Sequence, residues 1–185
     1  AQQFINKDIP VFVQDDKDAT EIRKEGFRNI QVLNRDIEFQ GVRLTRVEGT
    51  HGTEEMYANP AYSVLLGESM GVVFAAPGEK TTYLMGDTVW TARVDKTLQN
   101  CQPDILIMNT GYAKSICYND SIIMGTEDVG RAATRMPKAK IVAVHMDAIN
   151  HCTVSRKNMR DFVHSRKLDK QVAVPDDGQI INFDK

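Results

Sequence analysis

The second half of the chain alternates short apolar runs with amphipathic stretches, and this alternation constrains the fold more than any other feature. Apolar runs rich in β-branched residues occupy positions 105–109, 140–145 and 171–174, while positions 126–136 and 155–168 have helical periodicity. A strand followed by a helix and a second strand is the unit from which parallel sheets are built. The pattern therefore predicts an α/β protein whose C-terminal part is a parallel sheet with crossover helices.

The first half predicts a β-α-β opening followed by a meander of strands. Between positions 37 and 47, two apolar runs flank Gln40 and Gly41, a pair typical of a tight turn. The other expected elements are strands at 10–14, 29–33, 63–66, 71–76 and 81–85, and helices at 19–26 and 92–100. A chain of 185 residues has the size of one domain, so residues 1–185 are expected to form a single domain.

Charge and cysteine content exclude several classes of partner and site. The formal net charge is −2, which gives no global attraction for nucleic acid or anionic lipid, so a small-molecule partner is expected. The three cysteines are far apart and form no Cys-x-x-Cys pair, which favours a reducing compartment. No apolar run approaches the roughly 20 residues that cross a bilayer. We expect a soluble cytoplasmic protein without a membrane partner.

Three ionisable side chains follow predicted strands at the point where each strand ends. Asp87 lies in Gly-Asp-Thr after the run that ends at Met85, His145 directly follows a buried run, and His51 lies between two glycines after a strand. Each has a common structural explanation: Asp87 in a turn or helix cap, and each histidine as a hydrogen-bonded core residue. Together, however, two imidazoles and a carboxylate at converging strand ends suit zinc, manganese or iron.

The segments around these residues carry a family resemblance that extends over nearly the whole chain. Thr-His-Gly at 50–52, Met-Gly-Asp-Thr-Val-Trp at 85–90 and Val-His-Met-Asp-Ala-Ile-Asn-His-Cys at 144–152 resemble, in order and spacing, the later metal motifs of metallo-β-lactamase-superfamily hydrolases. The nearest branch is the bacterial one that includes ascorbate-6-phosphate lactonase-like proteins. The resemblance implies an αββα sandwich. It also implies that His51 binds a first metal, His145 a second, and Asp87 bridges both.

One motif of that family is missing from the sequence. The His-x-His-x-Asp-His motif normally precedes the segment resembling residues 6–10, and the chain has only four histidines, at positions 51, 145, 151 and 164. We therefore expect an incomplete sandwich that lacks the N-terminal strands and this motif. The complete enzyme would hold two ions, and this chain would bind metal weakly or not at all. Exposed apolar surface and an open strand edge would favour a homo-oligomer or association with the missing N-terminal segment.

For the complete enzyme, the resemblance implies metal-dependent hydrolysis of a small-molecule ester, lactone, phosphodiester or amide bond by a metal-bound hydroxide. Asp87 would orient that nucleophile. His151 is the candidate catalytic donor to the leaving group, although it could equally orient His145 or bond loop carbonyls. Asn109 and Tyr112, after the strand at 105–109, are the candidate substrate-binding residues. Trp90 is expected to be a packing residue.

A second class of function stays open at this point. The sandwich could survive as a non-catalytic remnant or binding module whose site has too few ligands for tight metal binding. A doubly wound cofactor-binding domain is disfavoured, because no Gly-x-Gly-x-x-Gly turn follows a strand. Metal stoichiometry separates the enzyme from the remnant.

Overall fold

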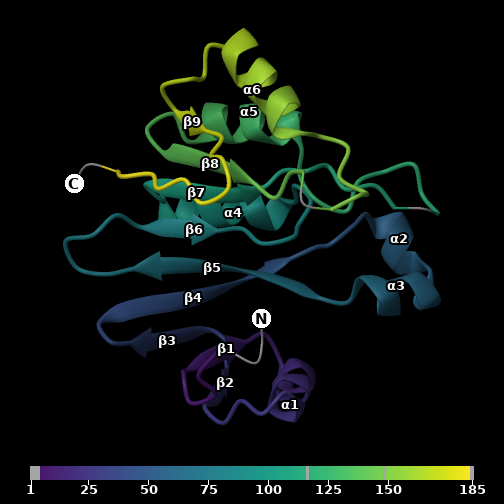
Figure 1. Cartoon of the computed structure of the whole chain (residues 1–185), viewed down its shortest axis with the longest axis vertical. Helices are drawn as coiled ribbons and strands as arrows, with labels where there is room; N and C mark the ends of the chain where they lie inside the picture. Colours follow the sequence, from purple (N-terminus) through teal and green to yellow (C-terminus); the bar gives the residue numbers. More distant parts are fainter. Residues whose placement is uncertain (1–4, 116, 148, 184–185) are drawn as a thin grey trace.

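The computed structural model describes residues 5–115, 117–147 and 149–183, and its centre is one long sheet of seven strands in the order β3-β4-β5-β6-β7-β8-β9 (Figure 1). A separate pair, β1 and β2, lies with α1 beside the β3 end of this sheet. In chain order, the elements are β1 (Val11–Val13), α1 (Asp16–Lys24), β2 (Ile30–Val32), β3 (Asp36–Phe39), β4 (Val42–Gly49), α2 (Glu54–Ala58), α3 (Pro60–Leu66), β5 (Ser69–Ala75), β6 (Thr82–Leu84), α4 (Ala92–Cys101), β7 (Ile105–Asn109), α5 (Thr126–Arg135), β8 (Lys140–Val144), α6 (Arg156–Ser165) and β9 (Val172–Ala173).

The long sheet is antiparallel in its first part and parallel in its second. Strands β3 to β6 pair antiparallel, and β3 turns into β4 at Gln40 and Gly41, whose φ values of 50° and 80° give a left-handed turn. Strands β6 to β9 pair parallel, and α4, α5 and α6 connect them. Parallel neighbours need such crossovers because the chain must return to the same end of the sheet. The predicted division into meander and parallel sheet is confirmed.

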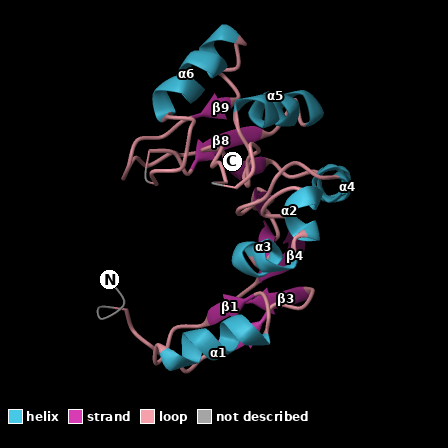
Figure 2. Cartoon of the chain, turned by 90° about the vertical axis from the view of Figure 1, so that its right-hand side faces the viewer, coloured by secondary structure: helices cyan, strands magenta, loops and turns pink. Residues whose placement is uncertain are grey.

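One face of the sheet forms the core with the crossover helices. Tyr83, Leu106 and Ile141 lie side by side on β6, β7 and β8 and are almost fully buried. Val94 of α4 and Met159 of α6 belong to the same buried cluster. Figure 2 shows α4, α5 and α6 against this part of the sheet. Trp90 packs against the cluster, as expected.

Among the described residues, no helices form a layer over the other face of the parallel part of the sheet. Val72, Leu84 and Ile107 are cross-strand neighbours on this face, and Leu84 is 36% exposed although β6 is a central strand. In Figure 1 the C-terminal segment crosses this side near β7. Parallel strands are usually covered on both faces, so an exposed leucine on β6, which pairs parallel with β7, marks a partly uncovered face.

One predicted element is wrong. Residues 63–66 were expected to form a strand, but they belong to α3. The Asn59 side chain accepts hydrogen bonds from the backbone N–H groups of Ala61 and Tyr62, and Pro60 occupies the first turn, where its missing N–H costs nothing. This cap favours a helix over the short apolar run Val64-Leu65-Leu66 that had suggested a strand.

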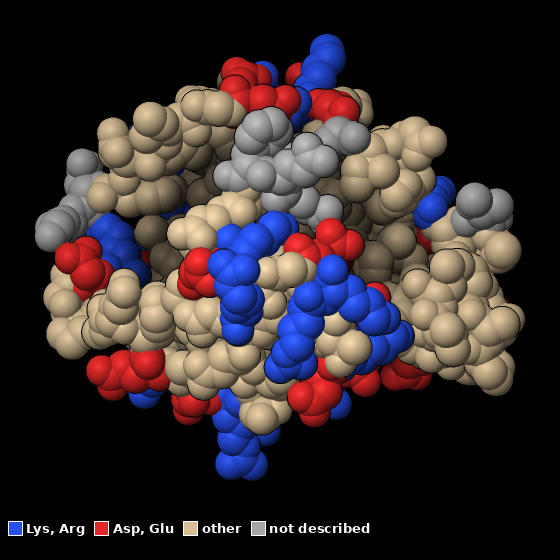
Figure 3. Space-filling model, turned by 60° about the horizontal axis from the view of Figure 1, so that its bottom comes forward, with Lys and Arg blue, Asp and Glu red and all other residues tan. Residues whose placement is uncertain are grey.

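Charged side chains of both signs share the surface near the N-terminal unit. Figure 3 shows basic side chains in the middle of this face with acidic side chains around them. Exposed ion pairs of this kind include Arg28 with Asp8 at 2.6 Å and Lys24 with Glu21 at 2.7 Å. None of the described helices is long and apolar enough to span a lipid bilayer.

Candidate metal centre

Three parallel strands deliver polar side chains to the same edge of the sheet. Asn109 is the last residue of β7, His145 directly follows β8, and Asp87 comes three residues after β6. At the end of β6, Gly86 has a φ of 70°, and a Cβ there would lie 2.5 Å from the Met70 carbonyl oxygen. Glycine therefore lets the chain turn sharply and present Asp87 at this edge.

The three side chains meet at a single carboxylate oxygen. Asn109 Nδ2 donates a hydrogen bond to Asp87 Oδ1 at 2.7 Å, and His145 Nε2 lies 3.5 Å from the same oxygen. The side chains of His145 and Asp87 are 25% and 37% exposed, so solvent reaches both groups. The structure thus brings together two predicted metal ligands, Asp87 and His145, and the predicted substrate-binding residue Asn109.

His145 adopts a backbone conformation that a non-glycine residue rarely has. Its φ is 64°, and that of Asp147 is 61°, both in the left-handed region. Neighbouring groups hold this turn: Thr110 N–H donates to Val144 O at 2.9 Å, and Asp147 Oδ2 accepts from the backbone N–H of Arg156 at 3.0 Å. Strained residues that the surroundings fix in place are concentrated at functional sites.

The spacing of Asp87 and His145 fits a shared metal ion. Two ligands at tetrahedral positions about 2.0–2.1 Å from zinc lie about 3.3 Å from each other, and the observed separation is 3.5 Å. Imidazole nitrogen and carboxylate oxygen are both zinc ligands. Two donors are fewer than a zinc site needs, and the described residues contain no group of three or more His, Cys, Asp or Glu side chains placed to hold a metal.

His51 lies in the neighbouring loop, which is hydrogen-bonded to the Asp87 loop. Val89 N–H donates to Thr50 O at 2.8 Å, so the residues preceding His51 and following Asp87 are paired. The His51 N–H donates to the hydroxyl of Tyr57 at 3.2 Å, and that hydroxyl donates to Gly67 O at 2.8 Å. Burial raises the pKa of the Tyr57 phenol, which keeps it neutral. Tyr57, which belongs to α2, therefore connects the His51 backbone to the C-terminal end of α3.

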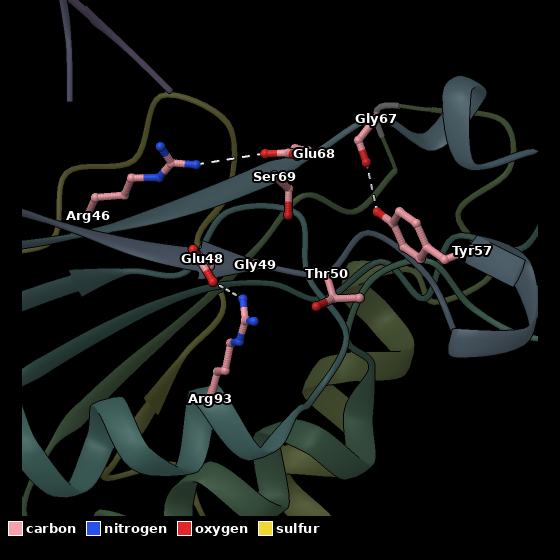
Figure 4. Close-up of a pocket in the computed structure, with 9 residues that line it drawn as sticks. All are labelled: Arg46, Glu48, Gly49, Thr50, Tyr57, Gly67, Glu68, Ser69 and Arg93. Atoms are coloured by element: carbon pink, nitrogen blue, oxygen red, sulfur yellow. Dashed lines mark hydrogen bonds and ion pairs between the residues drawn. The ribbon is translucent and has the colours of Figure 1, made fainter. Parts of the chain in front are cut away.

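A cavity of about 340 Å³ adjoins this loop (Figure 4). Arg93 pairs with Glu48, and Arg46 lies 3.9 Å from Glu68, so positive and negative side chains balance. The cavity is lined by Arg46, Glu48, Gly49, Thr50, Tyr57, Gly67, Glu68, Ser69 and Arg93. Its charge pairs give it no preference for an anion over a cation.

The other two predicted site residues lie on loops that cross next to His145. His151 is exposed, and its carbonyl accepts from Lys114 N–H at 3.1 Å. Tyr112 has a φ of 47°, and its carbonyl accepts from the Thr153 hydroxyl at 2.9 Å. These contacts are made by backbone atoms, so they leave the His151 imidazole and the Tyr112 phenol without an assigned role.

Comparison with known proteins assigns the chain to a family. It is 37% identical over 183 residues to UPF0173 protein YddR of Bacillus subtilis (strain 168), a match that covers 99% of this chain and 70% of that protein. The chain belongs to the UPF0173 family. A scan against protein-family models found no match.

Solved structures similar to this UPF0173 chain define its fold. The structure of a possible metal-dependent hydrolase from Veillonella parvula DSM 2008 superposes with a TM-score of 0.94 and 48% identity, covering 96% of this chain and 68% of that one. Isothiocyanate hydrolase from Delia radicum gut bacteria has a TM-score of 0.94 and 42% identity, covering 98% and 70%. The metallo-beta-lactamase fold protein YhfI from Bacillus subtilis, at 13% identity, a TM-score of 0.59 and coverage of 89% and 62%, shares the fold. The predicted metallo-β-lactamase fold is confirmed.

Two residues of this UPF0173 site were not predicted from the sequence. Thr88 is almost fully buried and its hydroxyl connects the His51 and Asp87 loops. Cys152 Sγ lies 3.7 Å from the His145 carbonyl oxygen. Burial raises the pKa of the Cys152 thiol, and the nearby carboxylates of Asp87 and Asp147 raise it further. The position of Thr88 in Gly-Asp-Thr was the available signal, since a hydroxyl beside a ligand can orient it.

Proposed function

We propose that this chain is part of a metal-dependent hydrolase of the metallo-β-lactamase superfamily that acts on a small molecule. The observation that carries the proposal is the convergence of Asp87, Asn109 and His145 on one carboxylate oxygen at the edge of the sheet. Of two solved proteins with TM-scores of 0.94, one is named a possible metal-dependent hydrolase and the other an isothiocyanate hydrolase, which supports the reaction class.

In this proposal, Asp87 and His145 hold a divalent metal, with zinc, manganese and iron as candidates. Such an ion supplies activation of a water molecule and polarisation of the bond to be broken. Asn109 donates one hydrogen bond to Asp87 Oδ1 and so would fix the plane of the carboxylate, and the second lone pair of Oδ1, which lies 3.5 Å from His145 Nε2, would be left for the metal. His151 donates a proton to the leaving group, and Tyr112 contacts the substrate from the neighbouring loop.

We further propose that residues outside this chain complete both the sandwich and the ligand set. The partly exposed Leu84 supports a second sheet that would cover this face, because burying apolar surface is favourable. The similar hydrolases are longer, since this chain covers 68% and 70% of their lengths. His51 would then join a first metal and His145 a second, and the chain alone would bind metal weakly. A second copy of the chain is the alternative cover.

For the substrate, we propose a small molecule with an electrophilic carbon or phosphorus, such as an ester, a lactone or a phosphodiester. The protein from Delia radicum gut bacteria is named an isothiocyanate hydrolase. An isothiocyanate also presents an electrophilic carbon to water, so this relative supports a carbon electrophile more than a phosphorus one.

The second candidate function is a binding module without catalysis. The observation that favours it is that the described residues bring together only two of the metal-ligand candidates, Asp87 and His145. Such a site would bind a metal ion weakly and would turn over no substrate.

Metal content and hydrolysis together test these candidates. Equilibrium dialysis against zinc, manganese and iron, followed by elemental analysis, would be run on the wild-type chain and on Asp87→Ala and His145→Ala. His164→Ala is the matched control, because the His164 side chain is 87% exposed on α6 and is not one of the residues that meet at the sheet edge. We expect at least a tenfold loss of metal affinity in the two site variants and no loss in the control. Equal binding by all four proteins would contradict the proposed site.

The hydrolysis assay uses the chain extended to the length of its relatives. A panel of one ester, one lactone, one phosphodiester and one isothiocyanate is offered at saturating metal, and His145→Ala serves as the inactive reference. Turnover of one class that His145→Ala abolishes supports the enzyme. Metal binding that depends on Asp87 and His145, without turnover of any class, supports the binding module.

A further inference from the structure

The hydroxyl of Thr88 lies between the two loops that carry His51 and Asp87. Thr88 is 1% exposed, and Ser121 and Thr110 are the other polar residues buried to this degree in the described part of the chain. Its Oγ1 accepts a hydrogen bond from Thr50 N–H at 2.9 Å and donates one to Val89 O at 2.9 Å. A hydroxyl can donate one hydrogen and accept at its lone pairs, so both roles are used at once.

Backbone hydrogen bonds extend this connection in both directions. Val89 N–H donates to Thr50 O at 2.8 Å, so Thr50 is bonded through both its N–H and its C=O. The Thr88 carbonyl accepts from Met124 N–H at 3.1 Å, which fixes the Asp87 loop to the segment before α5. Because His51 follows Thr50 and Asp87 precedes Thr88, each candidate ligand is one residue away from this junction.

Close packing leaves the two loops little freedom to shift. A Cβ on Gly49 would lie 2.4 Å from Ser69 Oγ and 3.3 Å from the Thr88 Cβ, so glycine at this position lets the strand before His51 lie close to both residues. If the Thr88 hydroxyl were lost, the partly buried Thr50 N–H would lose this partner. A donor shielded from solvent is unfavourable without a partner, so the loop would move until water or another acceptor reached it.

We propose that Thr88 is a positioning residue that sets the distance between His51 and Asp87, and therefore the geometry of the metal site they serve. This inference rests on the proposed function for the metal, but the hydrogen bond that carries it does not. Residues that orient metal ligands typically change metal affinity or activity by about 10–100-fold when they are replaced.

The test compares Thr88→Val, which keeps the shape and removes the hydroxyl, with Thr88→Ser, which keeps the hydroxyl and removes the methyl group. Zinc affinity of the chain is measured by competition with a chromogenic chelator. We expect about 10–100-fold weaker binding in Thr88→Val and a change below about threefold in Thr88→Ser. Thr134→Val is the matched control, since the Thr134 hydroxyl donates to Gly130 O on the exposed side of α5.

Amide hydrogen exchange reads the same hydrogen bond without any metal. The Thr50 amide should exchange faster in Thr88→Val, while the Ile141 amide, which donates to Gln171 O at 2.9 Å, should keep its wild-type rate. If the Ile141 amide also exchanges faster in Thr88→Val, this variant is destabilised throughout the fold. The exchange rate of the Thr50 amide in Thr88→Ser, which keeps the hydroxyl, is then the deciding measurement.

Unchanged Thr50 exchange in Thr88→Val, or equal zinc loss in Thr88→Val and Thr88→Ser, would overturn the proposal. If neither this chain nor the chain extended to the length of its relatives binds zinc, the proposed metal function fails on its own. The exchange rate of Thr50 still decides whether Thr88 holds the two loops.

Discussion

Replacing Asn109 measures the contact that orders the candidate site. Asn109→Ala removes the amide that donates to Asp87 Oδ1 at 2.7 Å. A hydrogen bond to a charged group contributes about 1.5–3 kcal/mol. Because the Asp87 side chain is 37% exposed, water replaces part of that contribution, and we expect a loss below this range, about 1 kcal/mol. For a chain of this length, that corresponds to a melting temperature lower by about 2–4 °C.

Asn109→Asp sharpens the test because it has almost the same shape and places a second carboxylate beside Asp87. Two like charges 4 Å apart repel by about 4 kcal/mol at an effective dielectric constant of 20. Exposure reduces this, so we expect about 2 kcal/mol at low salt, more than in Asn109→Ala. In 1 M salt the Debye length is about 3 Å, and the difference between the two variants should shrink.

Thermal unfolding followed by circular dichroism measures both variants at low and at high salt. Asn100→Asp on α4 serves as the charge control, since Asn100 is exposed. The reasoning is refuted if Asn109→Ala and Asn109→Asp unfold at the same temperature at every salt concentration. It is also refuted if Asn100→Asp shows the same salt-dependent loss.

Three further substitutions test other parts of the structure. Gly111→Ala places a methyl group against the His145 carbonyl and should lower the free energy of unfolding by about 1–3 kcal/mol. Gly130→Ala, within α5, should not lower it, and urea unfolding measures both variants. Burial raises the pKa of Asp128, so the ionised carboxylate lowers the free energy of unfolding once the pH exceeds that pKa. Asp128→Asn should therefore raise the free energy of unfolding at pH 7. The same gain at pH 4 would argue against this reasoning. If a second copy of the chain covers the sheet face at Leu84, Leu84→Ser should weaken self-association in sedimentation velocity, and unaltered association would contradict that cover.

The strand-end residues could be predicted because parallel strands have a simple geometry. The apolar runs at 105–109 and 140–145 end at the polar residues Asn109 and His145, and Asp87 follows the run at 81–85. The carboxyl ends of parallel strands lie at one edge. Asp87, Asn109 and His145 follow three adjacent strands, so their meeting follows from strand order alone. The role expected for Asn109 was substrate binding, whereas the structure has its amide bonded to Asp87.

Other features depend on contacts that sequence patterns do not encode. The run at 63–66 had no strand partner to find, and the side chain of Asn59 capped it as a helix. Thr88 gives no periodic signal, because its importance comes from Thr50, which is 38 residues away in sequence. The place of His51 relative to Asp87 is likewise set by hydrogen bonds between loops, which a pattern of apolar residues cannot predict.

The central claim is that Asp87 and His145 share a metal ion. Crystals grown with zinc, with diffraction recorded on both sides of the zinc absorption edge, test it most directly. The account predicts an anomalous peak about 2.0–2.2 Å from both His145 Nε2 and an Asp87 carboxylate oxygen. Zinc bound elsewhere in the molecule, with the 3.5 Å contact between Asp87 and His145 unchanged and no peak beside it, would contradict the account.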